Sequence, residues 1–141
     1  GLDVIRYEAL ITEACAKLSD AGIKVSLFID ADLQQIDAAK RTAAPVIEIH
    51  TGHYADAENH TRQQQLLNGI TVACEHADNI GLQVNAGHGL NRQNLYDIAC
   101  LQYVRELNIG HAIIADSIFM GIEKAVSEYR KLMREARSLL G

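Results

Sequence analysis

The chain is poor in the residues that mark disulfide-rich or zinc-binding proteins. Its 141 residues include only three cysteines, which are widely spaced and lie in helical patterns: Cys15, Cys74 and Cys100. An odd number of separated cysteines with apolar neighbours predicts reduced, buried thiols rather than disulfides. The sequence also lacks a Cys-x-x-Cys pair and a His-Glu-x-x-His pair, so we expect no structural metal site.

An excess of basic charge and long apolar runs are also missing. The formal net charge of −5 at pH 7 argues against a nucleic acid or an anionic membrane as a partner. No apolar stretch approaches the roughly 20 residues that a membrane-spanning helix needs, and no secretory signal pattern is visible. We therefore expect a cytoplasmic protein. The 48% of hydrophobic and 22% of charged residues are typical of a globular domain.

Helical and strand patterns alternate along the chain without a linker. The sequence predicts helices over residues 4–21, 31–44, 61–80, 91–103 and 117–140, and strands over residues 23–30, 45–52, 82–87 and from 107 onward. Residues 61–64 (TRQQ) read as a capping box for the third helix, and we expect Asp116 or Ser117 to cap the last one. One helix followed by four strand–helix units is typical of α/β proteins with a parallel sheet. Residues 1–141 should therefore form a single unit.

Alternation within the predicted strands separates an aliphatic face from a polar one. The aliphatic face, expected to meet the helices, comprises Val25, Leu27, Ile29, Ile47, Ile49, Leu82, Val84, Leu107 and Ile109. The opposite face comprises Ser26, Phe28, Asp30, Glu48, His50, Asn85, Gly87, Asn108 and Gly110. The second set is too polar for an ordinary packed layer, and a barrel lumen or a cleft lined by functional groups explains it better.

Three of these strands end in residues suited to binding and proton transfer. Residues 84–90 read VNAGHGL and residues 106–114 read ELNIGHAII, while Glu48 and His50 lie two apart on one face of a strand. Glycine lets a ligand approach the backbone closely, and histidine can move a proton near neutral pH. We therefore expect a phosphate or proton-transfer site at these strand ends.

Each candidate also has a plain structural alternative. His88 could be a structural histidine, Glu48 could be a salt-bridged core carboxylate, and residues 110–111 could form a tight turn between strand and helix. A carboxylate inside an aliphatic strand is costly unless it is paired or functional. His50 faces the same side as Glu48 and could orient it.

Two aspartates complete the candidate set. Asp30 and Asp32 stand where a predicted strand ends and a helix begins. Helix capping explains both better than catalysis does, and the role of Asp30 stays open.

Four motifs, taken in order, give the chain a resemblance to a known family. Residues 25–32 (VSLFIDAD), 47–52 (IEIHTG), 84–90 (VNAGHGL) and 106–114 (ELNIGHAII) resemble pyridoxine 5'-phosphate synthase, with matching gaps over the whole chain. The resemblance implies a (βα)8 TIM barrel, of which this chain would supply the C-terminal half. A whole barrel usually needs about 250 residues. Because the first residue is Gly1 and not an initiator methionine, we expect either a processed chain or part of a longer polypeptide.

The resemblance also implies a reaction and a set of roles. The family condenses 3-amino-2-oxopropyl phosphate with 1-deoxy-D-xylulose 5-phosphate to pyridoxine 5'-phosphate, without a metal or organic cofactor. His88 would donate protons and Glu48 would stabilise developing positive charge. Gly89, Gly110 and His111 would hold the amino-ketone phosphate. The resemblance further implies small phosphorylated molecules as partners and a homo-oligomer, which is an octamer in that family.

The sequence departs from the family pattern in two places. Just after the last predicted strand, where family members often carry an arginine or another residue, residues 115–117 of this chain read Ala-Asp-Ser. Asp116 would therefore place an acid near the phosphate. No segment matches the N-terminal histidine, glutamate and arginine motifs of the family, so this chain alone should hold an incomplete active site. The alternatives are another phosphate-binding TIM-barrel lyase or isomerase and a catalytically incomplete half-barrel module that serves assembly.

Overall fold

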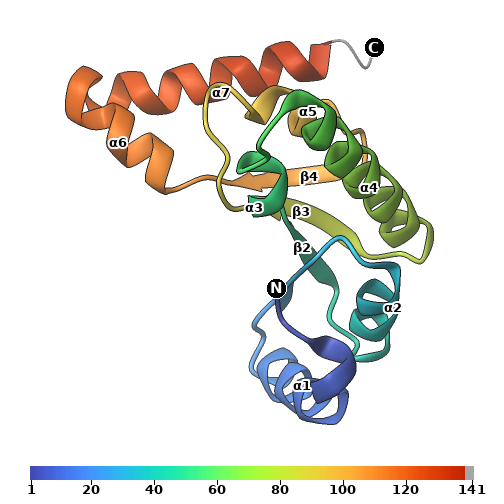
Figure 1. The fold of residues 1–141 in the computed structure, drawn as a ribbon. Coiled ribbons are helices and arrows are strands. Elements are labelled where there is room, and N and C mark those ends of the chain that lie inside the picture. Colours follow the sequence, from blue (N-terminus) through green and yellow to red (C-terminus); the bar gives the residue numbers. More distant parts are fainter. Residues whose placement is uncertain (139–141) are drawn as a thin grey trace.

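Four parallel strands form the centre of the molecule, and helices connect each strand to the next (Figure 1). The computed structural model describes residues 1–138. The strands are β1 (Ser26–Ile29), β2 (Val46–His50), β3 (Gln83–Gly87) and β4 (Val104–Asn108). The helices are α1 (Val4–Asp20), α2 (Leu33–Arg41), α3 (Gly52–Ala55), α4 (His60–Asn79), α5 (Leu95–Ala99), α6 (His111–Met120) and α7 (Ile122–Ser138). The strands pair in the order β1-β2-β3-β4, which confirms the predicted α/β class with a parallel sheet.

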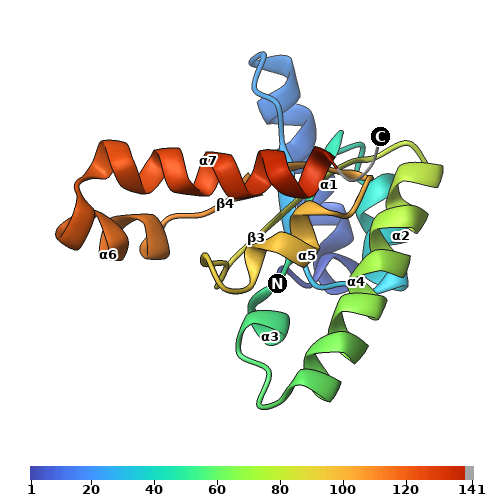
Figure 2. The same ribbon diagram turned by 90° about the horizontal axis from the view of Figure 1, so that it is seen from above.

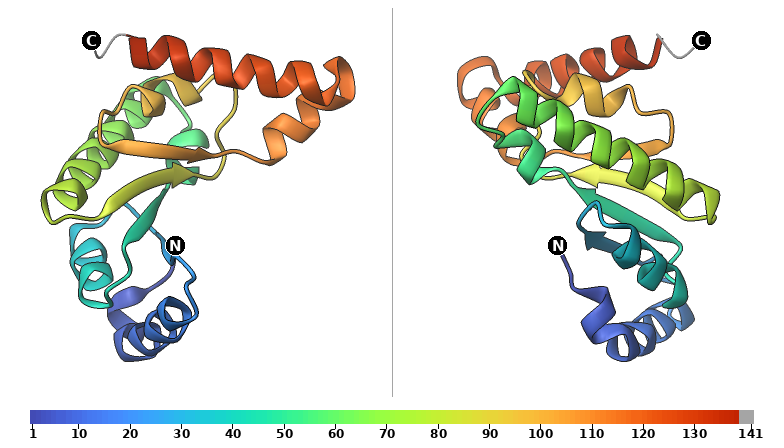
Figure 3. Two further views of the ribbon diagram at one scale, coloured as in Figure 1. Left: turned by 180° about the vertical axis from the view of Figure 1, so that it is seen from behind. Right: turned by 45° about the vertical axis from the view of Figure 1, so that its right-hand side comes forward.

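The strands present one buried aliphatic face and one polar face, as their alternation predicts. Ile29 and Ile49 are completely buried, in a core shared with residues of α1, α2 and α4. On the other face, the strand register places Glu48 beside Phe28 on one side and Asn85 on the other. The strand direction rotates steadily from β2 to β4 (Figures 1 and 3), which is the usual twist of a parallel sheet.

Helices α6 and α7 form a hairpin that extends past the end of the sheet (Figure 2). The predicted single helix over residues 117–140 is wrong: α6 already begins at His111, and Gly121 with φ 83° separates it from α7. Glycine adopts this left-handed conformation without a steric penalty, so Gly121 ends α6. Residues 139–140 of the prediction lie outside the described residues. No helix within residues 1–138 is both long and apolar enough to cross a membrane.

The predicted start of the third helix also differs from the structure. Asn59 caps α4, because its side chain accepts a hydrogen bond from the backbone N–H of Arg62. The capping box expected at residues 61–64 is therefore wrong, since those residues already lie inside the helix. The short helix α3, directly after β2, has no counterpart in the sequence prediction.

Between β3 and β4 the chain contains less helix than predicted. Only α5 forms within residues 91–103, and β4 begins at Val104 rather than near residue 107. Asparagines explain the lost turn: the side chain of Asn91 accepts a hydrogen bond from the backbone N–H of Gln93, and such local bonds favour a turn over a helix.

The cysteines are free thiols. Cys15 and Cys74 are buried as predicted, whereas Cys100 is only partly buried. Burial raises the pKa of the Cys74 thiol to about 12, so this thiol stays protonated and unreactive at neutral pH.

Candidate active site

A cavity of about 950 Å³ opens where the strands end. The further candidates His50, Asp30 and Asp32 do not line it. The five residues to which the family resemblance assigns a role all line it: Glu48, His88, Gly89, Gly110 and His111. They come from the middle of β2, from the loop after β3 and from the start of α6. Carboxyl ends of parallel strands are where α/β proteins place their ligands, so the fold and the sequence motifs indicate the same site.

His88 has an unusual backbone. Its φ is 82°, a left-handed value that residues other than glycine rarely adopt. The hydroxyl of Thr51 lies 2.7 Å from the carbonyl oxygens of both Gly87 and His88, and the Thr51 N–H donates to the Gly87 carbonyl at 2.8 Å. This completely buried threonine holds the strained residue in place. Strain of this kind concentrates at functional sites.

Asn94 shapes the loop that follows His88. Its side-chain amide donates to the carbonyl of Gly89 at 3.2 Å, and its side-chain oxygen accepts from the N–H of Asn91 at 2.8 Å. The hydroxyl of Tyr54 donates to the Asn94 carbonyl at 2.8 Å. These bonds fix the loop and leave Gly89 exposed at the cavity.

Glu48 is held by a residue to which the sequence assigned no role. The side-chain amide of Asn108 donates to Glu48 Oε2 at 2.7 Å. Gly87 lies between their strands, and a Cβ at that position would overlap Glu48 Oε1 and approach the Asn108 carbonyl oxygen at 2.9 Å. The glycine of the AGHGL motif therefore makes room for the carboxylate. The predicted polar face contains Asn108, but only the structure shows that its side chain reaches across Gly87 to Glu48.

Gly110 and His111 form the start of α6 at the cavity. Gly110 is the N-cap of this ten-residue helix, so the free backbone N–H groups of the first turn lie beside the cavity. These groups and the helix dipole favour a bound anion. His111 is exposed.

Asp116 lies inside α6 and does not cap the last helix, which corrects the sequence prediction. Arg92 pairs with it through Nε at 3.0 Å and a second nitrogen at 3.3 Å. The buried hydroxyl of Tyr129 also donates to it at 3.0 Å. Burial and this hydrogen bond raise the pKa of Tyr129 to about 12. The Arg92–Asp116–Tyr129 group thus ties the loop after β3 to α6 and α7, and the acid is neutralised by a partner.

Asp116→Ala should destabilise the protein more than Asp116→Asn does, by about 1–3 kcal/mol. Alanine leaves the hydroxyl of Tyr129, 2% exposed, without its acceptor, whereas asparagine keeps an acceptor oxygen. Urea unfolding of the two variants and the wild type measures the difference. Equal unfolding midpoints would show that the Tyr129 bond contributes nothing.

His50 bonds to Asp30 and not to Glu48. The distance from His50 Nδ1 to Asp30 Oδ1 is 2.9 Å. Asp32 alone caps α2, accepting from the N–H of Gln35 at 2.9 Å.

The His50–Asp30 pair and the nearby His53 could together hold a metal ion. Asp30, His50 and His53 bring one ligand atom each to within 4.8 Å of one another. The His50 ring also packs against that of His88, with centroids 4.9 Å apart.

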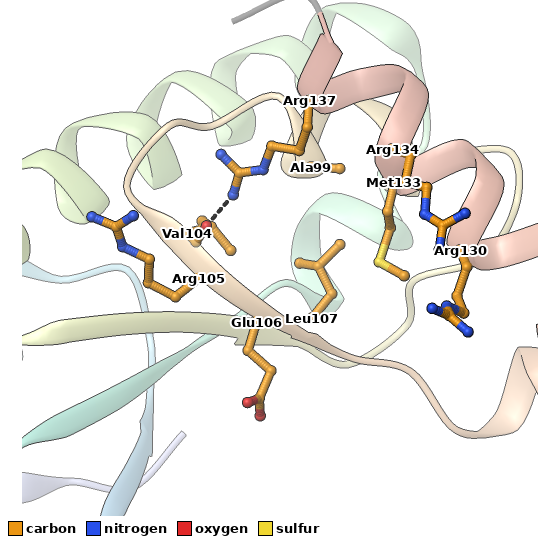
Figure 4. Close-up of a pocket in the computed structure, with 9 residues that line it drawn as sticks. All are labelled: Ala99, Val104, Arg105, Glu106, Leu107, Arg130, Met133, Arg134 and Arg137. Atoms are coloured by element: carbon orange, nitrogen blue, oxygen red, sulfur yellow. Dashed lines mark hydrogen bonds between the residues drawn. The ribbon is translucent and has the colours of Figure 1, made fainter.

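A second, smaller cavity of about 290 Å³ lies between β4 and α7 (Figure 4). Leu107 and Met133 point toward each other across it, and arginines surround it. Arg137 donates to the carbonyl of Val104. No histidine lines this groove, so it is a weaker candidate for proton-transfer chemistry than the larger cavity.

Comparisons with known proteins agree with the motifs at the larger cavity. The chain is 54% identical over 138 residues to the pyridoxine 5'-phosphate synthase of Colwellia psychrerythraea, a match that covers 98% of this chain and 56% of that protein. It is 50% identical over 137 residues to the protein of the same name from Idiomarina loihiensis, covering 97% of this chain and 57% of that protein. The chain thus spans a little over half the length of these curated relatives.

A family model matches nearly the whole described chain. Its description is "Pyridoxal phosphate biosynthesis protein PdxJ", and it covers residues 1–135. The chain belongs to the PdxJ family of pyridoxal phosphate biosynthesis proteins.

Proposed function

We propose that this chain is the C-terminal half of a (βα)8-barrel pyridoxine 5'-phosphate synthase. The reaction joins 3-amino-2-oxopropyl phosphate to 1-deoxy-D-xylulose 5-phosphate and yields pyridoxine 5'-phosphate, phosphate and water. The observation that carries the proposal is the convergence of His88, Glu48 and the start of α6 on one cavity, in a chain about half identical to proteins of that name.

The sheet topology supports a place within a barrel. Its four parallel strands follow one another in sequence order, which is how strands succeed each other in (βα)8 barrels. Within residues 1–138, β1 pairs in the sheet only with β2, and β4 only with β3. One further backbone bond reaches β1, from the N–H of Leu2 to the carbonyl of Phe28. Two open edges are what the remaining strands of a barrel would pair with.

Proton transfer explains why His88 and Glu48 face one cavity. The condensation forms an imine when the amine of one substrate attacks the ketone of the other and water leaves. Histidine at the cavity wall can protonate the departing oxygen. The Glu48 carboxylate, oriented by the amide of Asn108, can stabilise the positive charge that develops on nitrogen. Later loss of water and phosphate and closure of the ring need the same kinds of transfer.

The start of α6 is suited to the phosphate group. Gly110 has φ −118°, a value open to any residue, and a Cβ there would meet no atom within 4 Å. The fold therefore does not require glycine at this position. Binding of a phosphate group directly to the backbone N–H groups would require glycine, because the Cβ of any other residue would hold the phosphate away from them.

Location and assembly are parts of the same proposal. The three free thiols support a reducing compartment such as the cytoplasm. Exposed apolar side chains on the α6–α7 hairpin support a homo-oligomer or contact with the remainder of the barrel: Ile114, Ile118, Phe119 and Ile122.

Gly110→Ala should leave the fold intact and weaken binding of 3-amino-2-oxopropyl phosphate by about 10-fold or more, the size expected for lost hydrogen bonds to a charged group. Gly69→Ala is the matched control, because Gly69 is an exposed residue of α4 whose Cβ would also meet nothing. Calorimetry of the native polypeptide measures affinity, and mass spectrometry of pyridoxine 5'-phosphate measures the reaction.

Three outcomes separate the parts of this proposal. Product formed by the wild type and by Gly69→Ala, with weakened binding in Gly110→Ala only, supports both the reaction and the phosphate site. Wild-type affinity in Gly110→Ala would overturn the phosphate site. The absence of product from the wild-type polypeptide with both substrates would overturn the reaction.

A further inference from the structure

Asp30, His50 and His53 come from three segments and meet at one point beside the candidate active site. Asp30 follows β1, His50 ends β2 and His53 lies in α3. Their ligand atoms lie within 4.8 Å of one another, and the centroids of the two imidazole rings are 5.3 Å apart. No short sequence motif contains the three residues. The pairing of β1 with β2 brings the aspartate to the histidines.

A cavity of about 360 Å³ opens on the same three side chains. Asp32 and Gln65 contribute polar atoms to its wall, and Leu66 and Ile70 contribute apolar ones. An ion bound at the three side chains would have space for water on its remaining coordination positions, because this volume far exceeds the roughly 30 Å³ share of one water.

We propose that Asp30, His50 and His53 form a binding site for a divalent transition-metal cation, with zinc as the best fit. Zinc binds imidazole nitrogen and carboxylate oxygen at about 2.0–2.2 Å. Two ligands at that distance from one ion lie about 3–3.5 Å apart in near-tetrahedral geometry. The His50–Asp30 pair, at 2.9 Å, is already close to this spacing. Three protein ligands leave one position open to water.

His50 is oriented before any ion binds. Its side chain is only 16% exposed, and the edge of its ring packs on Phe28 with centroids 5.0 Å apart. Its Nε2 faces Gly52, where a Cβ would lie only 2.5 Å away, so Nδ1 is the atom available to a metal. A cation at Nδ1 would replace the hydrogen bond between Nδ1 and Asp30, with the imidazole in the tautomer that carries its proton on Nε2. His53 is exposed and free to rotate onto the ion.

The metal site does not depend on the proposed synthase function. None of the three side chains lines the 950 Å³ cavity. Of the three residues, His50 is in contact with the candidate active site: its ring centroid lies 4.9 Å from that of His88. An ion here would therefore be a neighbour of the candidate active site and not part of its proton-transfer set.

Titration of the native polypeptide with Zn²⁺ and Co²⁺, after removal of metal and with thiols kept reduced, tests the site. We expect one saturable site per chain and visible ligand-field absorption with Co²⁺. His53→Ala and the isosteric Asp30→Asn should each lower Zn²⁺ affinity by about 10-fold or more. His60→Ala is the matched control, because His60 is exposed at the start of α4 and outside the group.

Thermal unfolding gives a second readout, since a ligand that binds only the folded state raises Tm. At the same Zn²⁺ concentration the rise in Tm should be equal in the wild type and His60→Ala, and smaller in His53→Ala. Unchanged affinity in both His53→Ala and Asp30→Asn would overturn the proposal and place the metal elsewhere, for example on Cys100. Absence of a saturable site in the wild type would overturn it as well.

Discussion

Replacing His88 should lower the turnover of the assembled protein by roughly 100-fold or more, because a positioned general acid contributes at least about that much. The side chain is exposed at the cavity, so its loss leaves no void in the core. Its backbone has φ 82°, which asparagine tolerates better than alanine does. His88→Asn therefore separates the loss of the proton donor from backbone strain, and steady-state assays with both phosphorylated substrates measure the effect.

The comparison variants make this result specific. His60→Ala removes an exposed histidine outside the cavity and should keep full turnover. His88→Asn should unfold at a temperature at least as high as that of His88→Ala, which shows that lost activity does not come from lost structure. Wild-type turnover in His88→Asn would remove His88 from the reaction and leave it a structural residue of the β3 loop.

Local sequence patterns were enough to predict four strands and the polar residues near their ends, although β4 begins at Val104, three residues before its predicted start. Period-two alternation placed Ile49 in the core and Glu48 on the opposite face, because side chains must alternate along any strand. The Gly-His motifs placed His88 and His111 at strand ends that a parallel sheet brings together. Contacts across strands needed the register. The Asp30–His50 bond depends on the alignment of β1 with β2, and the Asn108–Glu48 bond crosses β3 diagonally over Gly87. No local pattern contains that information.

Helix boundaries were predicted less well, for reasons seen at single residues. Gly121 stands inside an apolar helical pattern, and an isolated glycine is tolerated there often enough that the pattern alone does not end the helix. The helix predicted over residues 117–140 extends across this break. Within that range Tyr129 is buried, whereas Ile118 is 77% exposed. Asp116 looked like a cap because it precedes the predicted helix, but Gly110 begins α6 and Arg92 pairs with the acid.

Residues 1–141 produced alone should show no synthase activity and should self-associate or fold poorly. The edges of β1 and β4 are open to pairing, and Ile118 and Phe119 are 77% and 90% exposed; such surfaces favour association. The chain also spans only 56% of the length of the Colwellia relative, and the family's N-terminal acid–base and arginine motifs have no match in it. Sedimentation and a product assay of the isolated chain measure both expectations.

A complementation experiment tests whether the missing part of the barrel restores the activity. Co-expression with the part of the Colwellia protein that this chain does not match should restore product formation, because sequences 54% identical over the shared region should offer similar strand edges and lumen residues to their partner half. The same experiment with His88→Asn should restore the complex but not the activity. A stable, active monomer of residues 1–141 would contradict the prediction: the catalytic set would then be complete within four strand–helix units, and the open edges of β1 and β4 would need no partner.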